Sequence, residues 1–447
     1  MLMLILEVLV MAVLVIYGLR IGGALGVGIL SILGLFIMIF VFQVPIGKAP
    51  VVPVMIILAI GIAGGLLEAS GGLDYLVHYA GKLIEKKPSA ITFVSPLIIF
   101  GFVFGIGTAN ITLSLEPIIA RTALRAGIRP ERPLVACVTT ANMALVCSPA
   151  ASSAIVAFGF LNGYGGYTFG QYLMIVLPAA LISTLALSIF MSFRGKPLDK
   201  DPVYQQRLAE GKIDDDMLHD KFADSEVPVF TRQQKLSVLA FLASVALILL
   251  LGTNESLLHK LTTPDVVNGK EVFMPATSTV QIFMFLAAAA IIFITKKSPA
   301  VIYKTQIFTA AVSAAIAVLG PGWLGATIFQ SPDNALVLQE SVGSLIAVAP
   351  WFIVIICGVV ATFVMSQTAI ISIIYPLALG LGVPPGFMAA MIQAVNVNYF
   401  IPAQPTLLFA EEIDPTGSTQ KYRFWLPGVF SLLVSITVGM AMWKLVL

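Results

Sequence analysis

The feature that most constrains this chain is a succession of apolar runs of bilayer-spanning length, which recur from one end to the other. A helix needs about 20 apolar residues to cross the hydrocarbon core of a membrane. Of the 447 residues, 58% are hydrophobic and 11% are charged, and the mean hydropathy is +0.98. Residues 2–19 carry Glu7 and lack a basic leader or a small-residue cleavage site, so we expect a span rather than a signal peptide. The sequence predicts an all-α integral membrane protein.

Lysine and arginine are divided unevenly between the segments that join these runs. If the basic clusters face the cytoplasm, only Lys48, Lys260, Lys270 and Lys444 of the 25 Lys and Arg residues lie on the other side. Such a bias is typical of cytoplasmic loops, and it predicts that both termini are periplasmic. We expect about ten spans, near residues 2–19, 22–42, 52–70, 133–160, 170–191, 236–252, 279–295, 305–321, 386–410 and 425–446.

Two further apolar segments, residues 89–126 and 349–382, must each begin and end on the same side of the membrane. Two full crossings with a turn would need roughly 40 residues, and the second arm of the first segment already carries charged residues. We therefore predict that each segment is a re-entrant helical hairpin. Five spans and one hairpin then form each of two inverted repeats, residues 1–191 and 236–447, joined by a cytoplasmic linker at 192–235.

Two of the predicted spans, 133–160 and 386–410, are interrupted in the same way. Asn142 stands seven residues before Pro149, and Asn398 stands seven residues before Pro405. Proline breaks a helix because it lacks an amide donor and clashes with the preceding turn. In lipid, such a break is tolerated only where the freed backbone groups line an enclosed polar site. Matched interruptions therefore indicate a transporter's substrate site, and we expect Pro149, Pro402 and Pro405 to shape the two breaks.

Other classes of function find little support. A net charge of +2 gives no argument for nucleic acid as a partner. Cys137, Cys147 and Cys357 lie in apolar segments and form neither a disulfide framework nor a metal pattern. No zinc-protease, hydrolase-elbow or P-loop motif occurs. We expect no enzyme, no metal and no cofactor, with the lipid bilayer and a small solute as partners.

Several short motifs are spread over nearly the whole chain. The most specific is Ile-Arg-Pro-Glu-Arg-Pro at residues 128–133. The others are Gly71-Gly72-Leu73-Asp74, Gly107-Thr108, Ser148-Pro149-Ala150, Leu198-Asp199-Lys200-Asp201, Ser366-Gln367, and Tyr399 through Pro405 followed by Asp414 and Thr416-Gly417.

These motifs resemble the anaerobic C4-dicarboxylate transporters, the Dcu family. The resemblance implies exchange or uptake of fumarate, succinate, malate or aspartate across a bacterial inner membrane. The family belongs to a wider class of ion transporters with hairpins and broken helices, several of which work by an elevator motion.

A dicarboxylate brings two negative charges into the membrane, and the N-termini of half-helices could hold them. Each such end carries about half a positive charge and free amide donors. Residues 136–191 and 349–410 contain no Lys or Arg, so we expect helix dipoles and neutral side chains to bind the substrate. The candidates at the hairpin tips and breaks are Thr108, Asn110, Asn142, Ser148, Ser366, Gln367, Thr368, Asn396, Asn398 and Thr406.

For the residues at the hairpin tips, ordinary helix capping without ligand contact is the alternative. Thr139, Thr140 and Gln404 are weaker candidates, because polar side chains in membranes often serve helix-to-helix hydrogen bonds.

Glu116 is a carboxylate well inside an apolar segment, which makes it a functional candidate. It could relay a proton, accept a cation, or pair with Arg121 or Arg125, two residues that could equally anchor the membrane edge. Whether transport is coupled to Na⁺ or H⁺, or is pure exchange, stays open.

The leading hypothesis is a secondary carrier with an elevator-type mechanism, and a homodimer built on its static spans is compatible with it. A carrier of another organic anion, such as a citrate-like acid, is the first alternative. A gated anion channel is the second.

Overall fold

The computed structural model describes residues 2–213, 228–267, 270–329, 331–338, 349–363, 366–400 and 404–446. Over these ranges the chain is helical apart from loops and one short antiparallel hairpin of β1 (Asp265–Val267) and β2 (Lys270–Val272). The described residues contain seven helical segments that are long and apolar enough to cross a membrane. The prediction of a helical, multi-pass membrane protein is confirmed in this coarse form.

The first helix, α1 (Leu2–Phe40), is bent sharply and forms two apolar arms. Gly22 and Gly23 have non-helical backbone angles, and Gly23 has a φ of +54° that favours glycine. The arms fold back on each other so closely that a Cβ on Gly18 would lie 2.8 Å from the carbonyl oxygen of Gly26. The first two predicted spans are therefore the two arms of α1.

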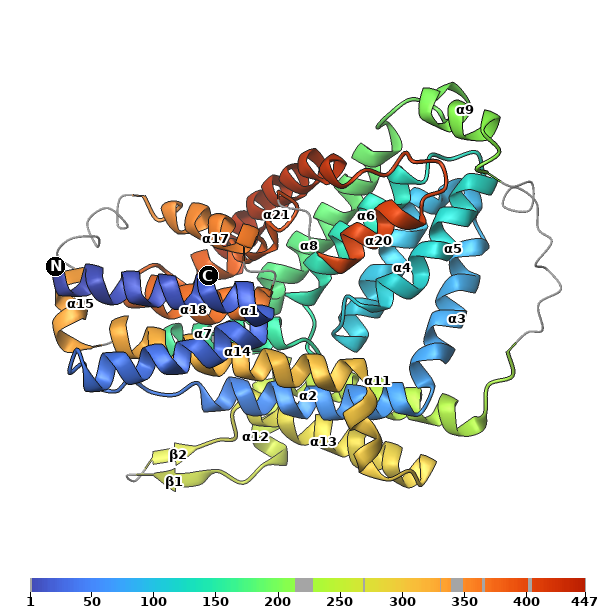
Figure 1. Ribbon diagram of the computed structural model, residues 1–447. Coiled ribbons are helices and arrows are strands. Elements are labelled where there is room, and N and C mark those ends of the chain that lie inside the picture. The colour runs from blue at the N-terminus through green and yellow to red at the C-terminus, as the bar shows by residue number, and fades with distance from the viewer. Residues whose placement is uncertain are drawn as a thin grey trace.

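One group of helices forms the lower layer in Figure 1. α14 packs against α1 and α2, and α13 packs against α2 and α11. We call this group the scaffold layer, because it holds no broken helix. Its members are α1, α2 (Val51–Ala69), α11 (Arg232–Thr253), α13 (Ala276–Thr295) and α14 (Gln306–Phe329).

A second group contains the two helix pairs α4–α5 and α17–α18 and both broken helices. α8 packs along α21 and against α4 and α6, so it belongs with this group, which we call the core body. It comprises α4 (Ile91–Ile106), α5 (Ile111–Arg125), α6 (Glu131–Leu145), α7 (Ser152–Gly165), α8 (Phe169–Ser192), α17 (Phe352–Phe363), α18 (Gln367–Gly380), α19 (Pro385–Ala390), η5 (Ile392–Asn396), α20 (Pro405–Ile413) and α21 (Trp425–Val446).

The remaining elements connect these groups. In Figure 1 the β1–β2 hairpin and the helix α9 lie at opposite ends of the molecule. These elements are α3 (Gly72–Glu85), η1 (Pro88–Ala90), η2 (Leu198–Lys200), α9 (Pro202–Ala209), α12 (Glu255–Leu261), η3 (Pro299–Lys304), α15 (Pro332–Leu338) and η6 (Lys421–Phe424).

The packing within the core body is reciprocal between the two halves of the chain. α5 contacts α20, and α7 contacts α18, so the second arm of each helix pair lies against the second half of the other half's broken helix. The first arm instead contacts the first half of its own broken helix, since α4 packs on α6 and α17 packs on η5. The interruptions of both broken helices are thereby brought to the same region.

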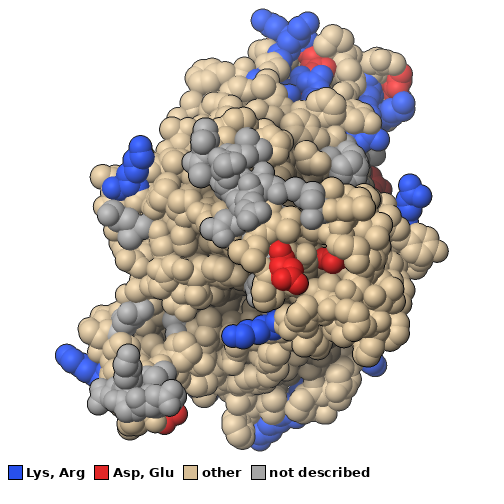
Figure 2. Space-filling model, turned by 90° about the vertical axis from the view of Figure 1, so that its left-hand side faces the viewer, with Lys and Arg blue, Asp and Glu red and all other residues tan. Residues whose placement is uncertain are grey.

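Figure 2 views the molecule from the left-hand side of Figure 1, where the N-terminus and the β1–β2 hairpin lie, and charged side chains are scattered over that face. Along the helices, many apolar side chains of α1, α13 and α21 are exposed. Exposed apolar helix surfaces of this extent suit contact with lipid rather than with water.

Candidate substrate site

Four helices of the core body begin at one cavity. The residues that precede α5, α7, α18 and α20 are Asn110, Ala151, Ser366 and Gln404, and all four line it. The first amides of a helix have no partner within that helix. The cavity is therefore surrounded by free backbone donors and by the positive ends of four helix dipoles.

The cavity has a volume of about 250 Å³. None of the described residues that line it is charged, and several carry hydroxyl or amide groups. They are Gly107, Thr108, Ala109, Asn110, Asn142, Leu145, Ala151, Ser152, Ser153, Ser366, Gln367, Thr368 and Gln404.

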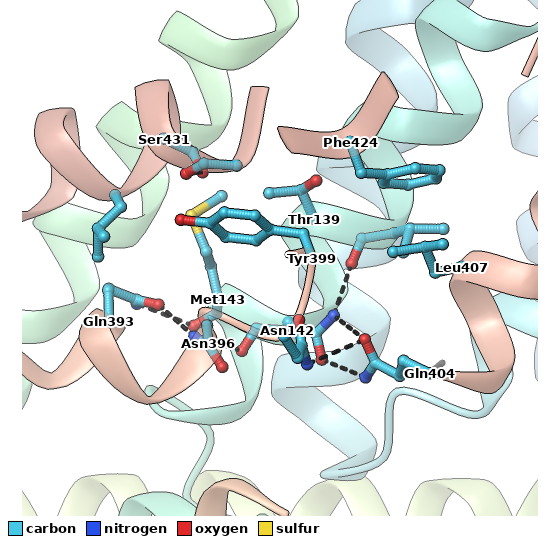
Figure 3. A pocket seen from close by; sticks show the side chains of 14 residues that line it. Thr139, Asn142, Met143, Gln393, Asn396, Tyr399, Gln404, Leu407, Phe424 and Ser431 are labelled. Atoms are coloured by element: carbon cyan, nitrogen blue, oxygen red, sulfur yellow. Dashed lines mark hydrogen bonds between the residues drawn. The ribbon is translucent and has the colours of Figure 1, made fainter. Parts of the chain in front are cut away.

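A pair of amide side chains lies between this cavity and a smaller pocket. Asn142 Nδ2 donates to Gln404 Oε1 at 3.0 Å, and Gln404 Nε2 donates to Asn142 Oδ1 at 2.8 Å. Asn398 Nδ2 donates to the same oxygen of Gln404 at 3.1 Å (Figure 3). The smaller pocket has a volume of about 20 Å³, enough for one or two water molecules. The larger cavity is thus the one with room for a solute.

The carbonyl groups freed where α6 ends are satisfied by amides from the second half of the chain. Gln367 Nε2 donates to the Asn142 carbonyl at 3.0 Å and also to Asn396 Oδ1. Asn396 Nδ2 donates to the Asn142 carbonyl at 3.3 Å, and Gln393 Nε2 donates to the Met143 carbonyl at 3.3 Å. A break in a membrane helix needs such partners, and here they join the two broken helices.

The turn between α4 and α5 sits directly against the break between α6 and α7. Gly107 has a φ of +80°, and a Cβ at this position would overlap the carbonyl oxygen of Ala150. Ser148 Oγ donates to the Phe104 carbonyl at 2.6 Å. Only glycine fits this approach, which sets the start of α5 beside the start of α7.

The starts of α7 and α18 meet through side chains. The hydroxyl oxygens of Ser152 and Thr368 lie 3.0 Å apart. Ser366 Oγ accepts from the Ala369 amide at 3.3 Å and so caps α18, as expected for a tip residue. Asn110 makes no side-chain capping bond to α5.

The structure brings most of the predicted binding residues together. Thr108, Asn110, Asn142, Ser366, Gln367 and Thr368 line the cavity, while Asn396 and Asn398 line the smaller pocket beside it. Ser148 lines neither, because its hydroxyl joins the helix-pair turn to the break. Thr406 lies inside α20, is 2% exposed, and lines neither space.

Of the three prolines predicted to shape the breaks, the two that the structure describes lie at or beside an interrupted helix. Pro149 lies between α6 and α7, and Pro405 is the first residue of α20. Pro402 lies outside the described residues.

Sequence reasoning missed or undervalued four residues. Ser152 and Ser153 follow the Ser148-Pro149 break and line the cavity. The N-terminal preference for serine could have indicated them. Gln404 was expected to join helices, yet it lines both spaces, and Gln393 lines the smaller pocket. Nothing local in the sequence distinguishes Gln393 from an ordinary buried amide.

Glu116 lies away from the cavity, in the packing of α5. Its side chain is 0% exposed, and neither carboxyl oxygen has a hydrogen-bond partner among the described residues. Arg121 is exposed, and it lines a separate pocket with Pro117. A hydrogen-bonded ion pair of Glu116 with Arg121 or Arg125 is therefore not what the described carboxyl oxygens make.

This fold, a helical multi-pass membrane protein with four helix starts around an uncharged cavity, is of the kind found in membrane transport proteins. The family described as anaerobic C4-dicarboxylate membrane transporters matches residues 3–447, so the chain belongs to that family. It is a membrane transporter and not an enzyme.

Relatives of the chain carry related names. The chain is 32% identical to the anaerobic C4-dicarboxylate transporter DcuB of Escherichia coli O6:H1, over 97% of each chain. It is 30% identical to the C4-dicarboxylate transporter DcuA of Wolinella succinogenes, over 98% of each chain.

A solved structure shares the fold. Neisseria gonorrhoeae MtrF, which is placed in a class of antimetabolite efflux pumps, matches with a TM-score of 0.54. The match covers 98% of this chain and 94% of MtrF at 14% identity. At that identity the likeness concerns the fold alone.

Proposed function

We propose that this chain carries C4-dicarboxylates such as fumarate, succinate, malate or aspartate across a bacterial inner membrane, by exchange of one dicarboxylate for another. The observation that carries the proposal is the convergence of the starts of α5, α7, α18 and α20 on one cavity. The names of the relatives support the choice of substrate class.

The charge arithmetic supports a doubly charged ligand. Each helix start contributes roughly half a positive charge, so four contribute about two, which balances the two carboxylates of the substrate. The described lining contains no Lys or Arg that would add to this positive charge, and no Asp or Glu that would reduce it. Hydroxyls and amides of the lining then orient the carboxylate oxygens.

We further propose that the chain is an inverted repeat and works as an elevator. In this proposal the two helix pairs are re-entrant hairpins, and the core body moves past the scaffold layer with its cavity. The reciprocal packing of α5 with α20 and of α7 with α18 supports the repeat. Both termini are periplasmic in this arrangement, and a homodimer through the scaffold layer would leave two core bodies free to move independently.

The substrate proposal is tested by counterflow in proteoliposomes. Labelled succinate should enter faster when the vesicles contain unlabelled dicarboxylate. Influx that ignores internal dicarboxylate would instead favour the gated channel. Thermal shifts with C3 to C6 acids test the substrate class, because a ligand that binds only the folded state stabilises it. A larger shift with a citrate-like acid than with any C4-dicarboxylate would favour the alternative carrier.

A further inference from the structure

Three chain segments of the core body meet at a buried cluster of charges. Glu131, the first residue of α6, is 0% exposed. Arg129 Nε lies 2.6 Å and Arg423 Nη1 lies 3.1 Å from one of its carboxyl oxygens, and Arg194 Nε lies 3.2 Å from the other. These arginines come from the α5–α6 turn, from the end of α8 and from η6. The cluster therefore joins the starts of α6 and α21 to the segment that leaves α8.

That segment, the first part of the predicted linker, folds back onto the core body. Arg129 Nη1 makes a second ion pair with Asp201, which is 4% exposed. Asp201 Oδ1 also accepts from the Val203 amide at 2.8 Å and so caps α9. Leu198 and Ile213 pack against Leu124 of α5 in a small apolar cluster. We call residues 194–213 the inner strap.

The inner strap also holds the connection between α20 and α21. Arg207 Nη1 donates to the Pro415 carbonyl at 3.0 Å. Asp414, 1% exposed, accepts from Ser418 Oγ at 2.8 Å, and Ser418 Oγ accepts from the Glu131 amide at 3.2 Å. The strap thus contacts a turn from each half of the chain.

At the opposite end of the core body, uncharged side chains make the described contact between the two halves of the chain. There Gly386, in the first turn of α19, lies directly against Tyr167 and against Trp443 near the end of α21, since a Cβ added to it would overlap the Tyr167 hydroxyl and the Trp443 indole. Both ends thus connect the start of a broken helix to elements of the other half, but among the described residues the ion pairs lie at the end with the inner strap. Buried ions are costly to separate, since each is left uncompensated when its partner leaves.

We propose that the inner strap is a fixed part of the core body and travels with it, rather than acting as a flexible tether between the two halves of the chain. This inference rests on the proposed elevator function. Its basis is that moving the strap away from the α5–α6 turn would break the ion pairs Arg129–Asp201 and Glu131–Arg194, while moving the α20–α21 connection away would break Glu131–Arg423.

Cross-linking in proteoliposomes tests the proposal. The variant R207C/P415C is joined by a short bifunctional thiol reagent, which fastens the strap to the α20–α21 connection. The three native cysteines are buried and serve as a nonreactive background. Succinate counterflow should be unchanged within about twofold after cross-linking. A loss of counterflow on cross-linking, restored by cleaving the cross-link, would show that the strap moves against the core body and would overturn the proposal.

A matched control joins the core body to the scaffold layer. A Cβ on Gly105 of α4 would lie 3.5 Å from Leu242 of α11. The variant G105C/L242C therefore places one cysteine in the core body and one in the scaffold layer. Its cross-link should abolish counterflow, and counterflow that survives would overturn the two-body premise and the proposal with it. Absence of counterflow in the unmodified protein would contradict the proposed substrate exchange instead, so the three failures are distinguishable.

Discussion

Asn142 and Gln404 form a reciprocal pair of amide hydrogen bonds, at 3.0 and 2.8 Å, although 262 residues separate them in the chain. Asn142 belongs to α6, and Gln404 stands directly before α20. The pair joins the two broken helices at the wall of the proposed substrate cavity. Its disruption should therefore alter stability and binding together.

We expect Gln404→Ala to lower the free energy of unfolding by about 1–3 kcal/mol, because it leaves the buried Asn142 side chain without this partner. Asn142→Ala should lower it by about 0.5–1.5 kcal/mol, because its partner Gln404 is only partly buried. The double variant should lose less than the sum of the two. Denaturation in detergent measures stability, and titration with succinate measures affinity. Thr140→Ala, also on α6 and bonded to Thr184 at 3.4 Å, is the control and should combine additively with Gln404→Ala. Additive losses for the Asn142–Gln404 pair would contradict the prediction.

Gly107→Ala should impair both stability and transport. The positive φ alone costs a residue with a Cβ about 1–2 kcal/mol, and the added Cβ would also push against Ala150. The control is Gly101→Ala in α4, the helix that Gly107 follows, because a Cβ at Gly101 meets nothing within 4 Å. Thermal unfolding and counterflow are the measurements. Equal behaviour of the two variants would mean that the turn does not need to sit against the break.

Ser152→Asp should keep or raise thermal stability while abolishing the shift caused by succinate. A carboxylate in the first turn of a helix stabilises it by about 0.3–1 kcal/mol, and at α7 it would occupy the place of a substrate carboxylate. Thr231→Asp, at the exposed start of α11, provides the matched control. It should gain stability similarly and retain the succinate shift. A normal succinate shift in Ser152→Asp would remove the start of α7 from the site.

Asp201→Asn should destabilise the protein at neutral pH and not in acid. Burial opposes ionisation of Asp201, but the amides of Val203 and Tyr204 and the charge of Arg129 outweigh it and lower the pKa of this carboxyl. A lowered pKa adds stability that is present above the usual aspartate value of about 3.9 and is lost as the pH falls through the lower, folded value. Unfolding midpoints of the variant and the parent should therefore differ at pH 7, begin to approach each other below about pH 4, and converge once the pH is below the lowered pKa of Asp201.

The exposed neighbour Asp199 gives the control for this pH series, and Asp199→Asn should match the parent throughout. A difference between Asp201→Asn and the parent that persists unchanged into acid would show that the carboxylate charge is not what holds the inner strap.

Glu116→Gln should preserve counterflow, and where an imposed proton gradient drives net uptake in the parent, the variant should lose that uptake. A buried carboxyl group without a hydrogen-bond partner can exchange a proton during the transport cycle, whereas an amide of the same shape cannot. Uptake assays with and without a pH difference separate the two activities, with the exposed Glu85→Gln as control. Gradient-driven uptake that persists in Glu116→Gln would exclude this carboxyl as the coupling group.

The sequence predicted the positions of the apolar helices and of both breaks, because length, hydropathy and proline act locally. It also led to the prediction that helix ends bind the anion, since residues 136–191 and 349–410 contain no Lys or Arg, and that prediction awaits a binding measurement. It could not predict that Gln404 meets Asn142 or that Gln393 reaches the Met143 carbonyl, because these contacts depend on how two distant segments cross. The packing of the inner strap on the core body could not be predicted for the same reason. Residues 194–213 have the composition of a solvated loop, and their partners lie far away in the chain.

The attraction of the proposed cavity for anions resides in the backbone of four helices rather than in any one side chain. Mutation can therefore reshape the lining during evolution without erasing that attraction. A substitution at Ala109 or Asn110, which line the cavity, would alter its shape and hydrogen bonding and leave the four helix starts in place. In this proposal, proteins with this fold can change the acid that they prefer through single substitutions in the cavity lining, and each intermediate protein still transports an anion.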